Sequence, residues 1–300
     1  MKIAVLLTCF NRKKKTVSCL SYLYSSLDSY NSNNTEKISL SVFITDDGST
    51  DGTSQEVKKS FADKDIYIFN PSDGPLYWAG GMRYAWKKSI EFSRDWDFFL
   101  LLNDDTYVFK NLFDEFIQTD TYCIHKHHKS GLYSGITCQG VNSKLTTYGG
   151  NVWTNKFLGK TKRLSPIGKP QTCDLTNANI LFVAKNVVDT IGILYEGYNH
   201  GCADYDYSNM ARKAALPVYV MSNFCGVCEN DHSNDIDIEK KVISMTLQER
   251  KKYFNHPKTS NVDYLKFIKR VSPLRYYMVY LGRMINLYFP RVYYSISKWR

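Results

Sequence analysis

The chain has 300 residues, of which 43% are hydrophobic and 15% aromatic, and its formal net charge is +10. This composition supplies a substantial core and excludes intrinsic disorder as the default state. No stretch approaches the roughly 18 uncharged apolar residues that a membrane-spanning helix needs. The short apolar start precedes a basic run, which is the wrong order for a secretory signal. The eight cysteines are scattered, so we expect reduced thiols and a cytoplasmic protein.

Apolar runs and helical periodicity alternate through the first hundred residues. Asn11 is the predicted cap of the first helix, and residues 30–37 read as a polar loop. The alternation predicts an α/β fold with a Rossmann-like, mixed but mostly parallel sheet flanked by helices. Strands are predicted at 2–8, 41–45, 66–69 and 97–102, with helices after the first three.

The pattern loosens after residue 120, where 122–129 and 143–151 predict loops and antiparallel strands. Composition changes near residue 238. The first 238 residues carry a net charge of −1, whereas a tyrosine-rich extension over 239–300 carries +11. Further elements are predicted as helices at 184–191 and 204–215 and a strand at 218–221.

Two loops after the first two strands carry side chains suited to a nucleoside. In an open α/β sheet, ligands bind outside the carboxyl ends of the strands. A carboxylate there accepts a strong hydrogen bond from the N3–H of uracil or thymine. A plain connecting turn and a helix-capping turn are the alternatives. The residues are Thr8, Cys9, Asn11 and Arg12 in the first loop and Asp46, Asp47, Gly48 and Ser49 in the second, DDGSTDGT.

Asn103, Asp104 and Asp105 follow a very apolar strand. Oxygen ligands suit Mg²⁺ or Mn²⁺, which commonly bind substrate phosphates and neutralise a departing diphosphate. We therefore predict a divalent cation here, with an acidic helix cap as the alternative. Gly80 and Gly81, expected between a strand and a helix, would let the backbone approach the diphosphate.

Asp204 and Asp206 stand at the start of a predicted helix. Either carboxylate could be a general base that takes the proton of an acceptor hydroxyl, and helix capping is the alternative. His232 lies downstream in ENDH and is a candidate third metal ligand, although a lone histidine is more often a surface residue.

In this order, these motifs resemble family 2 inverting glycosyltransferases of the GT-A fold. The similarity spans roughly residues 1–232, and DDGSTDGT and LLLNDDT are its most specific pieces. The sequence as a whole is similar to those of bacterial transferases that assemble O-antigen, lipopolysaccharide or capsule, including rhamnosyltransferase-like members. The resemblance implies a nucleotide-binding half at about 1–120 and an acceptor half at about 121–238, which together form the catalytic domain.

The resemblance also implies roles for individual residues. The two loops, with Asn103 and Asp104, would hold a UDP- or dTDP-sugar. Asp105 and Asp104 would bind the metal, and Asp204 would be the base of a single displacement that inverts the anomeric carbon. Where relatives have Glu-Asp this chain has Ala203-Asp204, and Asn103 replaces the first acid of the metal motif. The implied acceptor-binding residues are Trp78, Asn177, Asn179 and His200.

From residue 264 onward, basic residues alternate with apolar and aromatic ones at helical spacing, with breaks expected at Pro273 and Pro290. Such a stretch suits an anionic membrane surface, which would carry a lipid-linked glycan acceptor. A helix packed on the catalytic domain and an oligomer contact are the alternatives.

Other functions compete with this interpretation. A nucleotidyltransferase would carry a glycine- and lysine-bearing loop, which TCFNR is not. A nucleic-acid-binding protein could use the basic extension, but the near-neutral body and the acidic clusters lead us to expect no nucleic-acid partner. A catalytically inactive relative acting as a scaffold stays open.

Overall fold

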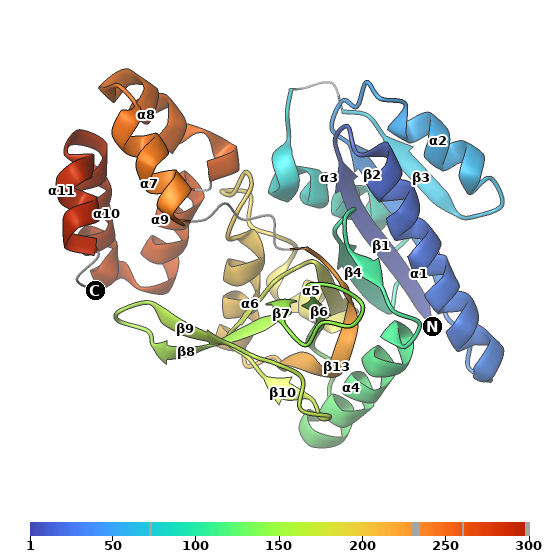
Figure 1. The fold of residues 1–300 in the computed structure, drawn as a ribbon. Coiled ribbons are helices and arrows are strands. Elements are labelled where there is room, and N and C mark those ends of the chain that lie inside the picture. The colour runs from blue at the N-terminus through green and yellow to red at the C-terminus, as the bar shows by residue number, and fades with distance from the viewer. Residues whose placement is uncertain (72–73, 230–234, 260, 298–300) are drawn as a thin grey trace.

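The computed structural model describes the whole chain except residues 72–73, 230–234, 260 and 298–300 (Figure 1). The strands are β1 (Lys2–Cys9), β2 (Ser39–Asp46), β3 (Ile66–Phe69), β4 (Phe98–Leu102), β5 (Tyr107–Val108), β6 (Leu132–Cys138), β7 (Thr146–Tyr148), β8 (Gly150–Asn155), β9 (Lys160–Arg163), β10 (Gln171–Thr172), β11 (Leu175–Thr176), β12 (Ile180–Ala184) and β13 (Val218–Val227). The helices are α1 (Lys13–Asn33), α2 (Thr53–Ser60), α3 (Tyr77–Phe92), α4 (Leu112–His127), α5 (Lys185–Ile191), α6 (Ala203–Lys213), α7 (Asp235–Ser244), α8 (Leu247–Asn255), the 3₁₀ turn η1 (Pro257–Thr259), α9 (Asn261–Val271), α10 (Pro273–Tyr288) and α11 (Pro290–Ser297).

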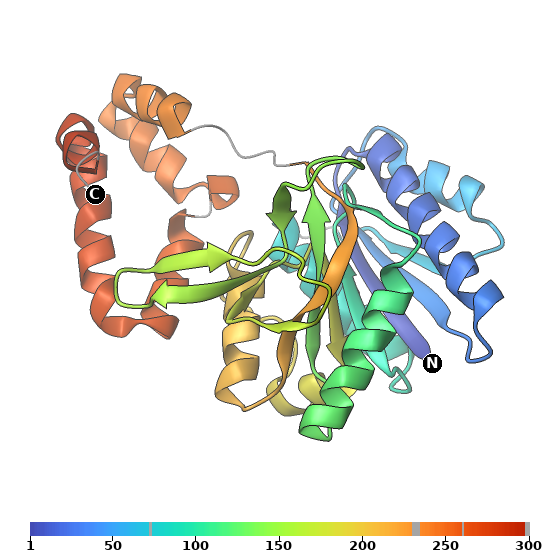
Figure 2. The same ribbon diagram turned by 60° about the horizontal axis from the view of Figure 1, so that its bottom comes forward.

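The main sheet has the strand order β10-β13-β6-β12-β4-β1-β2-β3. Strands β4, β1, β2 and β3 run parallel to one another, whereas β12 is antiparallel to both β4 and β6. The carboxyl ends of β1, β2 and β4 therefore meet at one edge of the sheet. A second, small sheet of β11, β8 and β9 includes a hairpin that projects toward the C-terminal helices (Figure 2).

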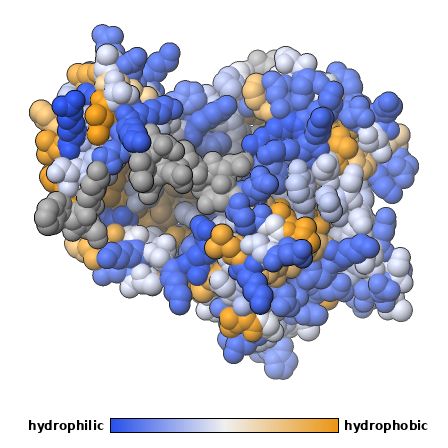
Figure 3. Space-filling model, viewed as in Figure 1, coloured by the Kyte–Doolittle hydropathy of each residue, from blue (hydrophilic) through white to orange (hydrophobic). Residues whose placement is uncertain are grey.

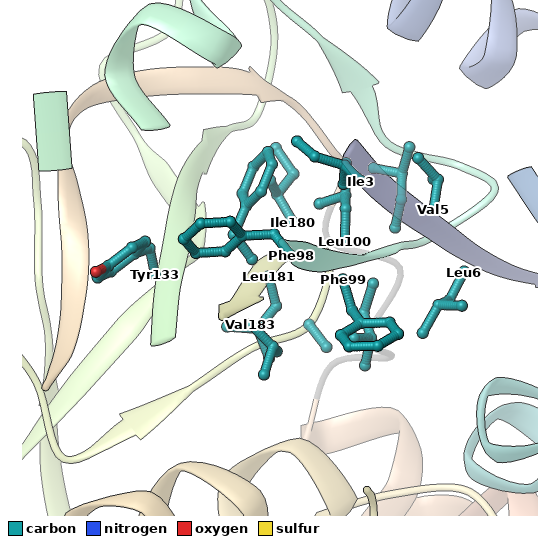
Figure 4. Close-up of a cluster of buried hydrophobic side chains, with 14 of the residues drawn as sticks. Ile3, Val5, Leu6, Phe98, Phe99, Leu100, Tyr133, Ile180, Leu181 and Val183 are labelled. Carbon is teal, nitrogen blue, oxygen red and sulfur yellow. The ribbon is translucent and has the colours of Figure 1, made fainter. Parts of the chain in front are cut away.

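Helices cover both faces of the sheet. α3 packs on β1 and β2, while α1 and α4 lie on the opposite face (Figure 2). Strands buried on both faces read as continuous apolar runs rather than as alternating ones. That is why Ile3 to Leu7 of β1 and Leu100 to Leu102 of β4 are all fully buried. Their side chains meet those of β12 and Tyr133 in the centre of the core (Figure 4).

The predicted α/β architecture is confirmed, and several local predictions are wrong. α1 continues to Asn33, so the loop expected at 30–37 is shorter. Asn11 does not cap α1, because its Oδ1 accepts the Thr50 N–H at 2.7 Å; Asp51 Oδ2 accepts the Lys13 N–H instead, at 2.9 Å. The expected loop at 122–129 is mostly the end of α4, whose last turn carries His125, Lys126 and His127, as the helix dipole favours.

The basic extension is helical as predicted, and its breaks fall at the two prolines that begin α10 and α11. It is also tied to the rest of the protein. Phe267, Ile268 and Val271 of α9 are buried in the main core, while Val242, Phe254 and Leu287 form a small core of their own. All eight cysteines are free thiols. Within the described residues, no helix combines the length and the apolar character needed to span a bilayer.

Candidate functional site

A cavity of about 760 Å³ opens at the carboxyl ends of β1, β2 and β4. Its other walls are the start of α3, the segment before β12, the start of α6, the end of β13 and the turn η1 of the extension. The predicted site residues that line it are Thr8, Cys9, Arg12, Asp47, Trp78, Asn103, Asp104, Asp105, Asn177, Asn179, His200 and Asp204.

Some predicted site residues lie elsewhere. Seven of them do not line the cavity. His232 lies outside the described residues, so its proposed role as a metal ligand stays a prediction. The seven are Asn11, Asp46, Gly48, Ser49, Gly80, Gly81 and Asp206.

Asp104 and Asp105 are bridged by one guanidinium. Arg12 Nη1 lies 2.9 Å from Asp104 Oδ1 and 2.6 Å from Asp105 Oδ2. Asp104 is buried, which raises its pKa to about 6 even though Arg12 opposes that shift. The cavity floor is therefore an acidic pair, already neutralised in part by a cation from the β1–α1 loop.

Asp204 faces the same cavity from the first turn of α6. Its Oδ1 accepts the Tyr205 N–H at 2.9 Å, and its Oδ2 accepts the Ala178 N–H at 3.2 Å. Burial raises the pKa of Asp204 to about 6, and the backbone donors oppose that shift. A carboxylate with that pKa is ionised at pH 7 but basic enough to accept a proton.

Asp206 belongs to a different environment although it is only two residues away. It is 1% exposed, and its Oδ2 pairs with Arg270 Nε of α9 at 2.7 Å. Because the two acids are separated by about 200° around the helix, one faces the cavity and the other faces the extension. In this structure Asp206 fastens the extension to α6.

The carboxylates of the DDGSTDGT loop have different roles: Asp46 supports the loop, and Asp47 lines the cavity. Asp46 accepts the Ser49 N–H at 2.8 Å and a hydrogen bond from the Ser54 hydroxyl, so it braces the loop. Asp47 lines the cavity and accepts the backbone N–H groups of Leu76 and Tyr77, at 2.8 and 3.0 Å. Asp47 thus holds the start of α3, rather than capping the helix that follows its own loop, while still facing the cavity.

The glycines of α3 serve packing. The prediction that Gly80 and Gly81 precede the helix is wrong, because α3 begins at Tyr77. A Cβ on Gly81 would overlap the hydroxyl of Thr8. Gly81 therefore allows α3 to lie directly against β1, and its carbonyl accepts the Thr45 hydroxyl at 2.8 Å.

The opposite side of the cavity is made of amides and rings. Trp78 Nε1 donates to Asn103 Oδ1 at 2.7 Å, and the Asn103 N–H donates to the Asn179 carbonyl at 3.1 Å. Of the buried side-chain atoms that have no hydrogen-bond partner among the described residues, two belong to residues that line the cavity, Asn177 Oδ1 and His200 Nδ1. Burial also lowers the pKa of His200, so its ring is neutral at pH 7. Buried polar atoms usually have partners, so these two are free to bind a ligand.

Sequence reasoning missed residues that reach the cavity from distant parts of the chain. His256 and Lys258 come from the extension, Glu229 from the end of β13, and Phe10 from a loop whose other members were predicted. Lys258 Nζ lies 5.9 Å from the centre of the Phe10 ring. Glu229 could have been found, since it follows a strand. No local signal marks His256 or Lys258, because only tertiary packing brings η1 over the cavity.

The acidic pair has the chemistry of a Mg²⁺ or Mn²⁺ site. Asp104 and Asp105 line the cavity with carboxylate oxygens. Arg12 binds one oxygen of each carboxylate. The second oxygens have only long contacts, 3.5 Å from Asp104 Oδ2 to Thr16 Oγ1 and 3.9 Å from Asp105 Oδ1 to Cys228 Sγ, so these two oxygens are the candidate ligands of a cation. Among the residues with described positions, no group of three or more His, Cys, Asp or Glu side chains is arranged to hold a metal. The fit therefore needs further ligands from the substrate or from solvent.

No protein-family model matches the chain, and no curated protein sequence matches it. The structure does resemble solved ones. S. aureus TarS residues 1–349 in complex with UDP-GlcNAc matches with a TM-score of 0.54 and 16% identity, over 97% of this chain and 83% of that one. GalNAc-T7 with UDP, GalNAc and Mn²⁺ matches with a TM-score of 0.53 and 10% identity, over 74% of this chain and 42% of that one. The chain has the fold of GT-A-type glycosyltransferases, which confirms the predicted fold class.

Proposed function

We propose that the protein is a glycosyltransferase that moves a sugar from a nucleoside diphosphate, UDP or dTDP, to a hydroxyl of a glycan. One observation carries the proposal: the Asp204 carboxylate and the Arg12-bridged acidic pair face one cavity at the carboxyl edge of a GT-A sheet. The cavity is also large enough for a nucleotide sugar.

On the donor side, Thr8, Cys9 and Asp47 would hold the nucleoside, with Phe10 offering an aromatic face to the base. Arg12 and Lys258 are the cations of the cavity wall and would bind the diphosphate. Asn11 and Ser49 support this side indirectly, since the Asn11 N–H donates to Ser49 Oγ at 2.9 Å and ties the two loops together.

Asp104 and Asp105 would hold Mg²⁺ or Mn²⁺. The cation, when bound, would neutralise negative charge on the departing diphosphate. The GalNAc-T7 structure contains Mn²⁺, which supports this part of the proposal. Arg12 would then shift part of its hydrogen bonding from the carboxylates to the phosphates.

On the acceptor side, Asn177 and His200 have free polar atoms for sugar hydroxyls, beside Trp78 and Asn179. The reacting hydroxyl gives its proton to Asp204, and its oxygen attacks the anomeric carbon. The bond from that carbon to the diphosphate oxygen breaks on the opposite face, so the configuration inverts. Positioning in the cavity and charge stabilisation supply most of the rate. Asp204 is the proposed base, because Asp206 pairs with Arg270.

The acceptor would be a lipid-linked glycan at the inner face of the cytoplasmic membrane, and the pathway would be the assembly of a bacterial surface polysaccharide such as capsule or lipopolysaccharide. The net charge of +11 on the extension supports a location at a negatively charged membrane surface. We place no nucleic acid in the cavity, because its floor is acidic.

The first test is the melting temperature of the purified protein with UDP, dTDP, GDP or CDP, each with Mn²⁺, Mg²⁺ or EDTA. Binding to the native state raises the melting temperature by mass action. A shift with UDP or dTDP that needs the metal supports the proposal. No shift with any nucleotide contradicts it, and binding without sugar transfer to any acceptor would identify an inactive scaffold.

A further inference from the structure

The extension exposes an apolar face that nothing in the described structure covers. Six side chains define this apolar face: Leu274, Tyr277, Met278, Leu281, Tyr288 and Phe289, exposed by between 47% and 78%. On α10 they recur three, four, seven and fourteen residues after Leu274, which is one side of a helix. Hydrophobic side chains are visible at this edge of the molecule, around α10 and α11 (Figure 3).

The other side of α10 is partly covered by the rest of the protein. Leu287 lies in the small core of the extension, and Tyr276 and Val279 pack against the main core. A helix that is apolar on both sides and buried on only one has a surface left for another partner. α11 also exposes apolar side chains, with Val292 and Ile296 about half exposed and four residues apart.

The charge around the apolar face selects the partner. Residues 264–300 contain eight Lys and Arg and no Asp or Glu. Arg275 and Arg283 bond to uncharged oxygens, of Tyr264 and of Phe254 and Asn255, so their charges are not neutralised by those contacts. A second copy of the chain would bring the same positive charge and repel, whereas a negatively charged surface would be attracted.

We propose that α10 and α11 dock this protein on an anionic lipid bilayer, with the apolar face inserted among the acyl chains and the flanking Lys and Arg at the phosphate headgroups. Tyrosines are suited to this depth, because the ring is apolar and the hydroxyl stays in the wet interface. The helices would lie in the plane of the interface rather than cross it.

The docking helices are rigidly connected to the cavity. Asp263 at the start of α9 is buried and accepts the N–H groups of Asn199, His200 and Gly201, at 3.2, 2.7 and 3.1 Å. α10 begins two residues after α9 ends. A protein docked through α10 would thus hold its cavity at a fixed place relative to the bilayer, where a lipid-linked acceptor is presented. This purpose rests on the proposed function, whereas lipid binding itself does not.

The experiment is flotation of the full-length protein with vesicles of phosphatidylcholine alone or mixed with phosphatidylglycerol, at low and high salt. We expect binding to the anionic vesicles that weakens with salt. Leu281→Glu should lower the partition coefficient about tenfold or more, because it removes a leucine that the bilayer would bury and adds a negative charge. Leu145→Glu is the matched control, since Leu281 is 61% exposed and Leu145 is 65% exposed.

Equal binding of Leu281→Glu and Leu145→Glu would overturn the proposal, and so would no binding of the wild type to anionic vesicles. Dimerisation without lipid that Leu281→Glu abolishes would assign the apolar face to a second copy instead. The nucleotide melting assay is run on the same samples. Vesicle binding without nucleotide binding would refute only the proposed function, and the converse only the docking.

Discussion

The substitution Asp204→Asn is expected to stop sugar transfer while the protein stays folded. A positioned general base contributes roughly 10²- to 10⁴-fold, so the loss corresponds to about 3–5 kcal/mol in the activation barrier. The variant should not be destabilised, because the two terms that change oppose each other and the favourable one can be the larger. One backbone N–H of the pair Ala178 and Tyr205 loses its acceptor, at about 1 kcal/mol. Removal of a partly buried charge whose pKa is raised to about 6 returns up to ~3 kcal/mol.

Asp206→Asn is the matched control, with the opposite expected outcome. It leaves the Arg270 guanidinium without its carboxylate, and breaking a buried pair costs about 3–5 kcal/mol. Arg270 is 34% exposed along its side chain, so solvent reduces that figure, and we expect about 2 kcal/mol. At about 2–4 °C per kcal/mol, the melting temperature should fall by roughly 4–8 °C. Below that temperature, kcat should change little.

The assay measures release of the nucleoside diphosphate identified by the melting experiment from a panel of its sugar derivatives, with a membrane lipid extract as acceptor. Melting temperatures of both variants are measured alongside. If Asp204→Asn kept more than a tenth of the wild-type rate, the assignment of the base would be wrong. It would also be wrong if Asp206→Asn were inactive at an unchanged melting temperature.

The pH dependence follows from the same carboxylate. Protonation of Asp204 below about pH 6 should reduce kcat/KM. The effect on stability has the other sign. Because the folded-state pKa is raised from 3.8, the native state binds more protons than the unfolded state between about pH 4 and 6, and this group stabilises the fold as the pH falls through that window. Inactivation near pH 5 without a lower melting temperature is the expected result; unfolding at the same pH would contradict it.

Three further changes test other parts of the site. Asp105→Asn should abolish the metal-dependent part of the nucleotide melting shift, and a shift that persists undiminished and still disappears with EDTA would place the metal elsewhere. Lys258→Ala should raise the donor KM about tenfold with kcat unchanged, because one charged contact to phosphate is lost; Lys251→Ala on the exposed surface of α8 is the control, and equal KM values would remove Lys258 from the donor site. Gly81→Ala should lower the free energy of unfolding by about 1–3 kcal/mol in urea denaturation through overpacking against β1. Gly140→Ala has open space and should be neutral, so equal effects would contradict the packing argument.

Part of the proposed donor side, including Thr8, Arg12 and Asp47, could be predicted from the sequence because it depends on local features. Each of its loops follows a strongly apolar strand, and parallel strands deliver such loops to a common edge. Arg12 and Asp105 were predicted at one site from two motifs 93 residues apart, and the structure joins them by an ion pair at 2.6 Å. The choice between Asp204 and Asp206 could not be made in this way. Both suit the start of a helix, and only the position of Arg270, on a helix far along the chain, separates them.

The same dependence on tertiary packing explains the wrong predictions for Gly81 and Asn11. The sequence predicts that Gly81 lets the backbone approach a ligand, whereas in the structure it lets α3 approach Thr8. The sequence does not show which group lies where a larger residue would place its Cβ. Asn11 looked like a helix cap because caps are identified by position, but its side chain bonds to the neighbouring loop and Asp51 takes over the cap from 38 residues away. In each case the residue type was informative and the partner was set by tertiary packing.

The extension follows the rest of the chain in sequence, but it also forms part of the cavity wall. Asp263 fixes the loop that carries His200, and η1, just before α9, places Lys258 at the cavity wall. Both contacts come from residues beyond 238, where the composition changes. A chain ending there would lose a cation of the cavity wall, leave the N–H groups at 199–201 without their acceptor, and lack Phe267 and Ile268, which are part of the main core. The change in composition therefore marks a change of surface, from a neutral body to a basic one, while the site itself is built from both sides of that boundary.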